Sequence, residues 1–141
     1  MFERCIYFNT NALVRKLNSR WEKAFTELGF TPSHGYLMRA VLTSPNLTQT
    51  QLATALQLEK STVTRFLDKL EKDGWLQREP SRTDQREKII KPTDKAKCIA
   101  ENFEKLGDDL YETMCKTLGK ENLEHFVKQL RDINLEISKA H

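Results

Sequence analysis

The sequence predicts a mainly α-helical chain with one small β-hairpin, and three features support that fold class. Apolar residues recur at every third or fourth position along most of the 141 residues, which is the period of a helix packed against a core. Between about residues 75 and 91 that period is lost, and two short runs that flank a polar loop are predicted to be strands. Threonine hydroxyls suit the N-cap position, and three helices are expected to begin at Thr31, Thr48 and Thr93.

The first helix is expected over residues 6–28, where apolar side chains share one face and Lys, Arg and Glu fill the other. Gly29 is its expected stop. Thr31 and Pro32 predict the N-cap and the first position of a second helix. Residues 44–46, Ser-Pro-Asn, are expected to break that helix.

Residues 47–74 have the pattern of two short helices joined by a tight turn. Thr48 and Gln51 form a capping-box pair that opens the first of these helices. The turn is expected near residues 57–60, and Gly74 can adopt the left-handed cap that ends the second helix. The second helix carries an apolar stripe at i, i+3, i+4 and i+7, made of Val63, Phe66, Leu67 and Leu70. This is the helix-turn-helix pattern, in which the second helix enters the major groove of DNA.

The segment after the helix-turn-helix predicts a hairpin and two further helices. Strands at 75–79 and 87–91 flank a loop over residues 80–86, which is rich in turn-forming residues and holds two arginines. A hairpin in this position is called a wing. One long helix capped by Thr93 is then expected, Gly119 interrupts it, and a last amphipathic helix follows.

The charge distribution indicates a polyanionic partner. The net charge of the chain is only +3. Between residues 60 and 91, nine Lys or Arg side chains stand against six Asp or Glu, so this segment carries the whole excess. A local basic excess on an otherwise neutral chain is typical of a surface that binds nucleic acid. The low hydrophobic content of 38% and the high charged content of 30% fit helices that bury apolar surface in a partner subunit.

Other features bear on the compartment and on catalysis. No apolar run reaches the ~18 residues of a membrane span and no signal-peptide pattern is visible, so we expect a cytoplasmic protein without a membrane partner. The cysteines are odd in number and unlike a zinc pattern, which favours a reducing compartment, and Cys98 and Cys115 are expected to pack within the long helix after the wing. Histidines 34, 125 and 141 have no metal-ligand spacing, so no metal and no cofactor is expected. An enzyme is disfavoured because no phosphate-binding loop or nucleophile–base arrangement is present.

Motifs spread over the helix-turn-helix and the wing resemble those of the MarR family of transcriptional regulators. Residues 47–56 resemble the first helix of the family's reading head. Residues 60–65, followed by 70–76, resemble its recognition helix and the entry into the wing. Residues 84–86, Asp-Gln-Arg, resemble the D-x-R signature of the wing.

The sequence departs from the family pattern at the exit from the wing. The family usually has Leu before the threonine that opens the next helix and Gly three residues after it, whereas this chain has Pro92 and Ala96. Proline lacks an N–H and suits a strand end. We therefore expect a local change at this point and no loss of the fold.

The resemblance implies a winged helix-turn-helix flanked by N- and C-terminal dimerisation helices. The chain is expected to be one domain over residues 1–141. Its DNA-binding core would occupy about 31–92, and its dimerisation helices about 1–30 and 93–141. In such a homodimer the first, fifth and sixth helices interlock, and two reading heads face a pseudo-palindromic operator. The apolar stripes of the terminal helices agree, because these helices have little core of their own to cover.

The recognition helix holds the residues expected to read DNA. Arg65 is the best candidate for guanine, since its guanidinium matches two acceptors on one base edge. Lys60 and Lys69 are expected at phosphates, which position a protein without specifying sequence. Taken singly these residues fit an ordinary solvated helix face, but inside a helix-turn-helix followed by a wing DNA contact is favoured. The predicted DNA-contacting set is Lys60, Ser61, Thr62, Thr64, Arg65, Lys69, Arg82, Thr83 and Arg86.

The wing is expected to contact DNA through Arg86, which we place in the minor groove because a narrow groove concentrates negative potential. DNA would repel Asp84, so its expected role is to stabilise the wing by holding Arg82 or Arg86 in a fixed pose. The alternative for Asp84 is an exposed surface pair that contributes little.

Two regulatory features follow only from the resemblance. Family members bind small aromatic or phenolic effectors between the dimer helices and the reading head. Trp21, Phe25, His34 and Tyr36 could line such a pocket, although core packing is the favoured account of such residues. Some members sense oxidants through a cysteine near the first helix, where Cys5 lies in this chain, although a lone thiol is more often inert.

The predicted function is therefore a sequence-specific DNA-binding transcriptional regulator, expected to be a repressor that binds its operator as a homodimer and is released by a small-molecule effector. One alternative is a winged-helix module for protein–protein contact. Another is a redox-sensing regulator that acts through Cys5.

Overall fold

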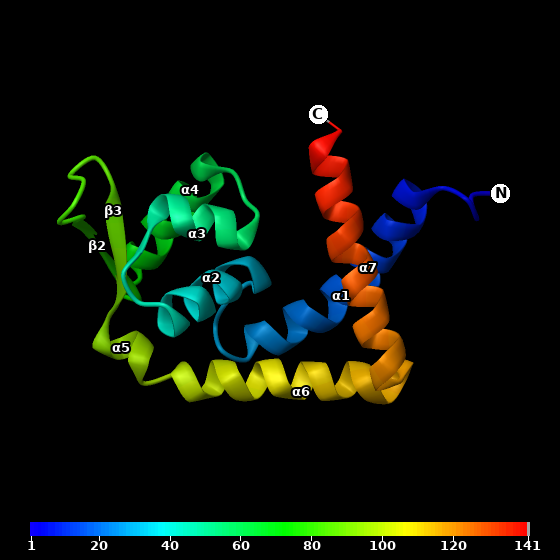
Figure 1. Cartoon of the computed structure of the whole chain (residues 1–141). Coiled ribbons are helices and arrows are strands. Elements are labelled where there is room, and N and C mark those ends of the chain that lie inside the picture. The colour runs from blue at the N-terminus through cyan, green and yellow to red at the C-terminus, as the bar shows by residue number, and fades with distance from the viewer. Residues whose placement is uncertain (141) are drawn as a thin grey trace. The chain divides into compact units, whose positions relative to one another are not determined.

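A computed structural model describes residues 1–140 and confirms a mainly helical chain with one small sheet (Figure 1). His141, one of the three histidines considered above, lies outside the described residues. The elements in chain order are α1 (Ile6–Thr26), α2 (Pro32–Thr43), β1 (Leu47–Thr48), α3 (Gln49–Leu56), α4 (Lys60–Lys72), β2 (Leu76–Pro80), β3 (Lys88–Pro92), α5 (Asp94–Lys97), α6 (Ala100–Leu118) and α7 (Lys120–Lys139). The chain forms two compact units, residues 1–104 and residues from 105 onward, and each is described by itself.

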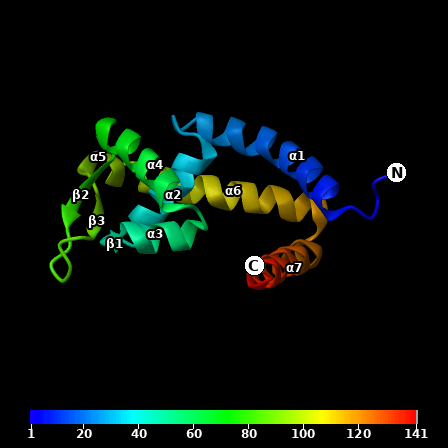
Figure 2. The ribbon, with the colours of Figure 1, turned by 90° about the horizontal axis from the view of Figure 1, so that it is seen from above.

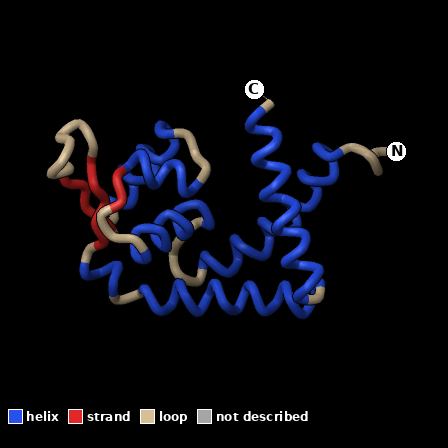
Figure 3. The backbone as a smooth tube through the Cα atoms, viewed as in Figure 1, coloured by secondary structure: helices blue, strands red, loops and turns tan. Residues whose placement is uncertain are grey.

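The first unit contains a three-stranded antiparallel sheet in the order β1-β3-β2. In the central strand β3, Ile90 pairs with Leu47 of β1 on one side and with Arg78 of β2 on the other. Figure 3 shows the strands in red, with the β2–β3 hairpin extending away from the helices of this unit. This hairpin is the wing expected from the sequence.

Helices α2, α3 and α4 pack together and against the sheet. Each helix has one apolar face, and these faces meet in a core from which water is excluded. The same helices lie side by side when the molecule is seen from above (Figure 2). The side chains with no exposed surface in this core are Leu37, Met38, Val41, Leu52, Val63, Leu67 and Ile90.

The helix ends follow the predicted chemistry. The Thr31 hydroxyl accepts from the backbone N–H of His34 at the start of α2, with Pro32 at the first helical position. Thr48 and Gln51 form the expected reciprocal capping box at the start of α3. Gly74 follows α4 with φ +82°, a left-handed conformation that favours glycine.

Three details of the secondary structure differ from the sequence-based expectation. Leu47 and Thr48 form a strand as well as the approach to α3. Both wing strands begin and end one residue later than predicted, so that Pro80 and Pro92 occupy the strand ends. The single long helix after Thr93 is divided into α5 and α6, because the N–H of Ile99 bonds to the carbonyl of Ala96 in a tighter turn.

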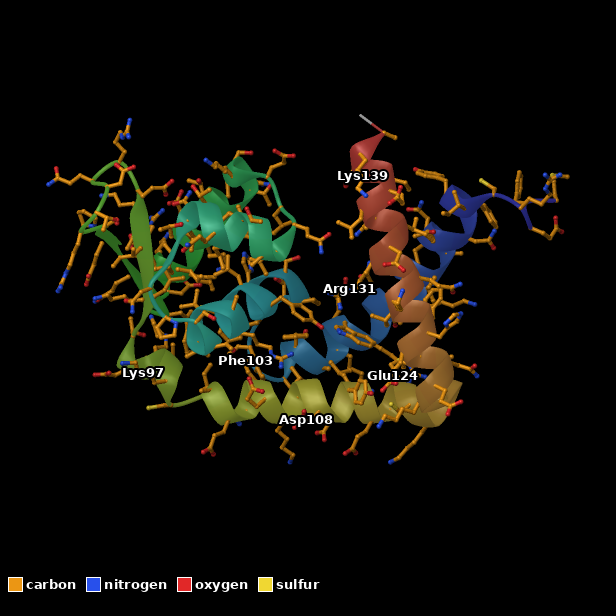
Figure 4. The ribbon with its side chains drawn as sticks, in the orientation of Figure 1. Lys97, Phe103, Asp108, Glu124, Arg131 and Lys139 are labelled. Carbon is orange, nitrogen blue, oxygen red and sulfur yellow. The ribbon has the colours of Figure 1, made fainter. Side chains whose placement is uncertain are left out.

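This division changes the setting of Cys98, for which the sequence predicts packing within a long helix. Cys98 instead forms the C-cap of α5 and is exposed. After the break, Phe103 of α6 is buried and contacts Phe30, whose ring also lies 5.0 Å from Trp75. Phe103 is labelled in Figure 4, and with Phe30 it attaches the start of α6 to the reading head.

The second unit consists of the rest of α6 and α7, which meet at Gly119 (φ +84°). The hydroxyl of Tyr111 donates to Glu124 across this helix pair at 3.2 Å. Hydrogen bonding to Cys115 and the nearby Glu124 carboxylate raise the pKa of Tyr111 to about 12. No described residue of α7 is buried. Its apolar side chains remain substantially exposed, namely Phe126, Val127, Leu130, Ile133, Leu135 and Ile137.

Candidate nucleic-acid interface

The outer face of α4 presents cationic and hydroxyl side chains. Lys60, Ser61, Arg65 and Lys69 are exposed, whereas the apolar stripe on the opposite face lies in the core. The N-cap residue is Glu59, and its side chain makes no capping hydrogen bond. The first turn of α4 instead offers backbone N–H groups beside Lys60 and Ser61, an arrangement that suits an anion.

Thr62 and Thr64 are only half-exposed, and Thr64 is already hydrogen-bonded within the protein. Its hydroxyl donates to the carbonyl of Lys60 at 2.9 Å and accepts from the side-chain amide of Gln49 at 2.5 Å. The single hydroxyl proton of Thr64 is thus engaged. Gln49, at the start of α3, is a residue that sequence reasoning missed, because its partner lies 15 positions away.

The C-terminal end of α4 is also fixed by side chains. Lys69 forms an ion pair with Asp73 at 2.9 Å, and hydrogen bonding to Lys69 lowers the pKa of Asp73. The ammonium of Lys95 donates to the carbonyl of Asp73 at 2.7 Å and lies 4.0 Å from the ring centre of Trp75. These contacts place a cation at the negative end of the helix dipole.

The wing loop is organised by two short polar side chains. Ser81 is buried, and its hydroxyl accepts from the backbone N–H groups of Thr83 and Asp84. The carboxylate of Asp84 accepts from the backbone N–H of Arg86 at 3.0 Å and from its Nε at 3.2 Å. The Arg86 side chain is nevertheless 92% exposed, and Arg82 and Thr83 are exposed beside it.

A second group that sequence reasoning missed connects the wing to the helices. Arg78 of β2 contacts Asp68 and Glu71 of α4, and the Thr50 hydroxyl of α3 donates to Glu87 at 2.6 Å. Asp68 and Glu71 are three positions apart and so share a face of α4. This spacing is the only feature of the sequence that points to a shared partner for the two carboxylates. Both contacts depend on tertiary structure.

Three of the four residues considered for an effector pocket contact one another. The indole N–H of Trp21 donates to the hydroxyl of Tyr36 at 2.9 Å, and Phe25 stacks on the Tyr36 ring. Phe25 also presses on α2, since a Cβ built on Gly35 would lie 2.3 Å from its ring. His34 makes a different contact, edge-on to Phe66 of α4.

The thiols and the possible cation sites give little further chemistry. Cys5 is exposed, and its sulfur caps α1 by accepting from the N–H of Phe8. Among residues 1–140, no group of three or more His, Cys, Asp or Glu side chains is placed to hold a metal ion. The same part of the chain has no helix long and apolar enough to cross a membrane.

A helix-turn-helix with an exposed cationic recognition face, followed by a β-hairpin that displays an arginine, defines a winged helix-turn-helix protein. Residues 30–88 match the sequence profile of the MarR family. This match runs from just before α2 to the start of β3, so the winged helix-turn-helix segment of the chain is similar to the MarR family.

Solved structures of MarR proteins share this fold over nearly the whole chain. The MepR–DNA complex of S. aureus is 21% identical in sequence, with 96% of this chain and 99% of that chain covered and a TM-score of 0.85. A MarR protein from Peptoclostridium difficile is 20% identical over 98% of this chain and 90% of its own, with a TM-score of 0.84. The transcriptional repressor CouR, bound to a 23-mer DNA duplex, is 21% identical over 94% of each chain, with a TM-score of 0.84.

Proposed function

We propose that the protein binds a pseudo-palindromic operator in double-stranded DNA as a homodimer and represses transcription. The observation that carries this proposal is the outer face of α4, where Ser61 and Arg65 are exposed on a helix fixed by a core on its other side. Arg65 would read a guanine, and Lys60 and Lys69 would contact phosphates. Arg86, with Arg82 and Thr83 beside it, would contact the neighbouring minor groove and backbone.

The exposed apolar surfaces support the homodimer. The apolar side chains of α7 have no cover within their own unit, and contiguous apolar surface of this kind marks an interaction site. At the other end of the chain, Ile6 and Tyr7 of α1 are also exposed. A second copy would bury both surfaces, with residues 1–30 and 93–141 acting as the dimerisation helices. Two-fold symmetry would then place the recognition helices about one DNA turn apart.

Release by an effector belongs to the same proposal. A small aromatic or phenolic molecule that binds near Trp21, Phe25 and Tyr36 would contact α1 and α2 together. If that molecule binds better to a dimer with a different spacing of its two reading heads, it raises the population of that state. The two heads then no longer match successive major grooves of the DNA. The protein would act in the cytoplasm, consistent with three unpaired thiols.

Selection of bound sites from random double-stranded DNA tests this function directly. We expect an inverted repeat whose half-sites lie about 10 base pairs apart, centre to centre. Light scattering should give the mass of a dimer, or twice the 16.5 kDa chain. Log K should fall by about 0.9 per neutralised phosphate for each tenfold rise in salt. Selection without an enriched sequence, together with absent duplex binding, would favour a protein–protein module.

The redox alternative has its own test. Cys5 is exposed at the start of α1, so an oxidant can reach it. If Cys5 senses oxidants, peroxide should weaken DNA binding of the wild type and leave Cys5→Ser unaffected. Equal responses of the two proteins would remove this mechanism.

A further inference from the structure

Arg78 is the cation of the basic segment that is most engaged inside the protein. It lies in β2, and its side chain is 21% exposed. One of its terminal nitrogens, Nη2, lies 2.7 Å from Oδ1 of Asp68 and 3.2 Å from Oε1 of Glu71. Its Nε and its backbone N–H both donate to the other carboxylate oxygen of Glu71, at 3.4 Å and 3.0 Å. A single residue of the wing therefore holds two carboxylates of the recognition helix.

We propose that Arg78 is a positioning residue for DNA binding, which fixes the wing against the recognition helix and neutralises Asp68 and Glu71 without contacting DNA itself. This inference rests on the proposed function, because it assumes that α4 and the wing bind one duplex. It assigns a role to an arginine that composition alone would count among the phosphate contacts.

The charge of the carboxylates explains why they need a partner. Asp68 lies on α4 three positions after Arg65, and its side chain is 60% exposed. On a helix that lies in the major groove, an unpaired carboxylate at this position would repel the phosphates. Hydrogen bonding to Arg78 lowers the pKa of Glu71, and that same contact raises the pKa of Arg78. Glu71 and Arg78 therefore remain charged at neutral pH, and the ion pair with Asp68 joins the same cluster.

The position of Arg78 in the sheet explains the mechanical part of the proposal. Arg78 pairs with Ile90, which is completely buried, so the backbone of β2 at this point is fixed to the core. The wing loop begins only three residues later, at Ser81. At the far end of the loop, Glu87 accepts from Thr50 of α3. The wing is thus attached to both helices of the helix-turn-helix, and the Arg78 attachment sets its angle relative to α4.

The geometry of the guanidinium argues against a direct phosphate contact. Arg78 uses Nε and Nη2 in its fork toward Glu71, and Nη2 also faces Asp68. Both bidentate forks of a guanidinium, Nε with Nη2 and Nη1 with Nη2, include Nη2, which already faces two carboxylates. Arg82 and Arg86 lie in the loop itself and have exposed side chains, so they are better placed to contact DNA.

The experiment measures affinity for the selected operator across a range of salt concentrations. We expect Arg78→Met to weaken binding about tenfold or more, because it leaves two carboxylates unpaired and loosens the wing. The slope of log K against log salt should remain that of the wild type, because no phosphate contact is lost. The triple variant Asp68→Asn, Glu71→Gln, Arg78→Met removes the unpaired charges and should recover most of the lost affinity.

Two controls make the rescue specific. The variant Arg78→Met, Asp94→Asn, Glu101→Gln has the same net charge as the triple variant, but it neutralises exposed carboxylates on α5 and α6. It should not recover affinity. Arg82→Met removes an exposed wing arginine. If Arg82 contacts one phosphate, the slope of log K against log salt should become shallower by about 0.9. Arg78→Lys should recover only part of the affinity, since an ammonium cannot form the fork.

The outcomes separate this inference from the proposed function. If the wild type binds no duplex, both fail. If the wild type binds and Arg78→Met has unchanged affinity, only the role of Arg78 fails. The same holds if Arg78→Met loses affinity, the slope of log K against log salt becomes shallower by about 0.9, and the triple variant does not rescue binding. Should Arg78→Met unfold, the triple variant and Arg78→Lys still decide the question, because neither leaves a carboxylate pair without compensation.

Discussion

The recognition helix and the wing loop present similar side chains by different physical means. Helix α4 is held by apolar burial, with Val63 and Leu67 completely buried behind its outer face. The loop over residues 81–87 is held by short polar contacts around Ser81 and Asp84, while Arg86 extends into solvent. Apolar packing fixes one orientation of α4, which suits the reading of base edges. A loop held by a few short-range hydrogen bonds can adjust, which suits contact with a backbone.

The difference implies that the helix can be disturbed from its buried side. We expect Leu67→Ala to lower the free energy of unfolding by about 2–5 kcal/mol, through lost burial and the cavity left behind. Denaturant unfolding monitored by circular dichroism measures this change. The matched control is Leu58→Ala, since Leu58 is 37% exposed and lies in the turn before α4. An equal loss in both variants would mean that apolar burial behind α4 is not what holds this helix in place.

The reading role proposed for α4 predicts a loss of sequence discrimination when Arg65 is removed. Arg65→Ala should weaken operator binding by about 1–3 kcal/mol and relax the preference at one base pair of each half-site. Competition between the operator and its single-base variants, measured by fluorescence anisotropy, checks this prediction. A uniform loss across all sequences would instead make Arg65 a phosphate contact.

The wing should contribute to the strength of DNA binding, whereas α4 contributes to the choice of sequence. Arg86→Ala should weaken operator binding by more than about tenfold, whereas the fold and the dimer survive because the side chain is exposed. A gel shift or anisotropy titration with the wild type in parallel measures the effect. Asp84→Asn is a useful companion, since it keeps the shape of the side chain that accepts from Arg86 and removes its charge. Unchanged affinity of Arg86→Ala would exclude Arg86 from the interface.

These two regions also differ in how far the sequence predicts them. Local chemistry was sufficient for the helix-turn-helix, because the Thr48–Gln51 capping box and the Gly74 cap act within a few residues. The predicted fold class, mainly helical with a small β-hairpin, is confirmed because it too follows from such local patterns. Strand β1 was missed, because two residues are too short for any period and Leu47 acquires its partner, Ile90, only in the folded chain.

The site shows the same limit. The apolar spacing of α4 correctly predicted that Ser61 and Arg65 face outward. It did not predict that Gln49 engages the hydroxyl of Thr64, or that Arg78 faces Glu71 and Asp68. A periodic pattern identifies the free face of a helix, but tertiary contacts decide which side chains on that face are already occupied.

The smallest predicted effect concerns pH and the helix side of the comparison. His34 lies between α2 and α4, edge-on to Phe66. Burial, together with the charge of Lys69, lowers the pKa of His34 from 6.5, against the opposing effect of Asp73. Between the folded-state pKa of His34 and 6.5, the unfolded chain therefore binds a proton that folded His34 does not. The free energy of unfolding should rise with pH across the interval between the folded-state pKa and 6.5.

Denaturant unfolding at pH values on either side of this interval measures the effect. His34→Gln should have a smaller rise in stability with pH than the wild type. The control is Arg86→Ala, which changes an exposed side chain of the wing and should keep the wild-type rise. If His34→Gln retains the full pH dependence, the contact between His34 and Phe66 does not couple α4 to protonation, and the helix side would be as insensitive to pH as the wing.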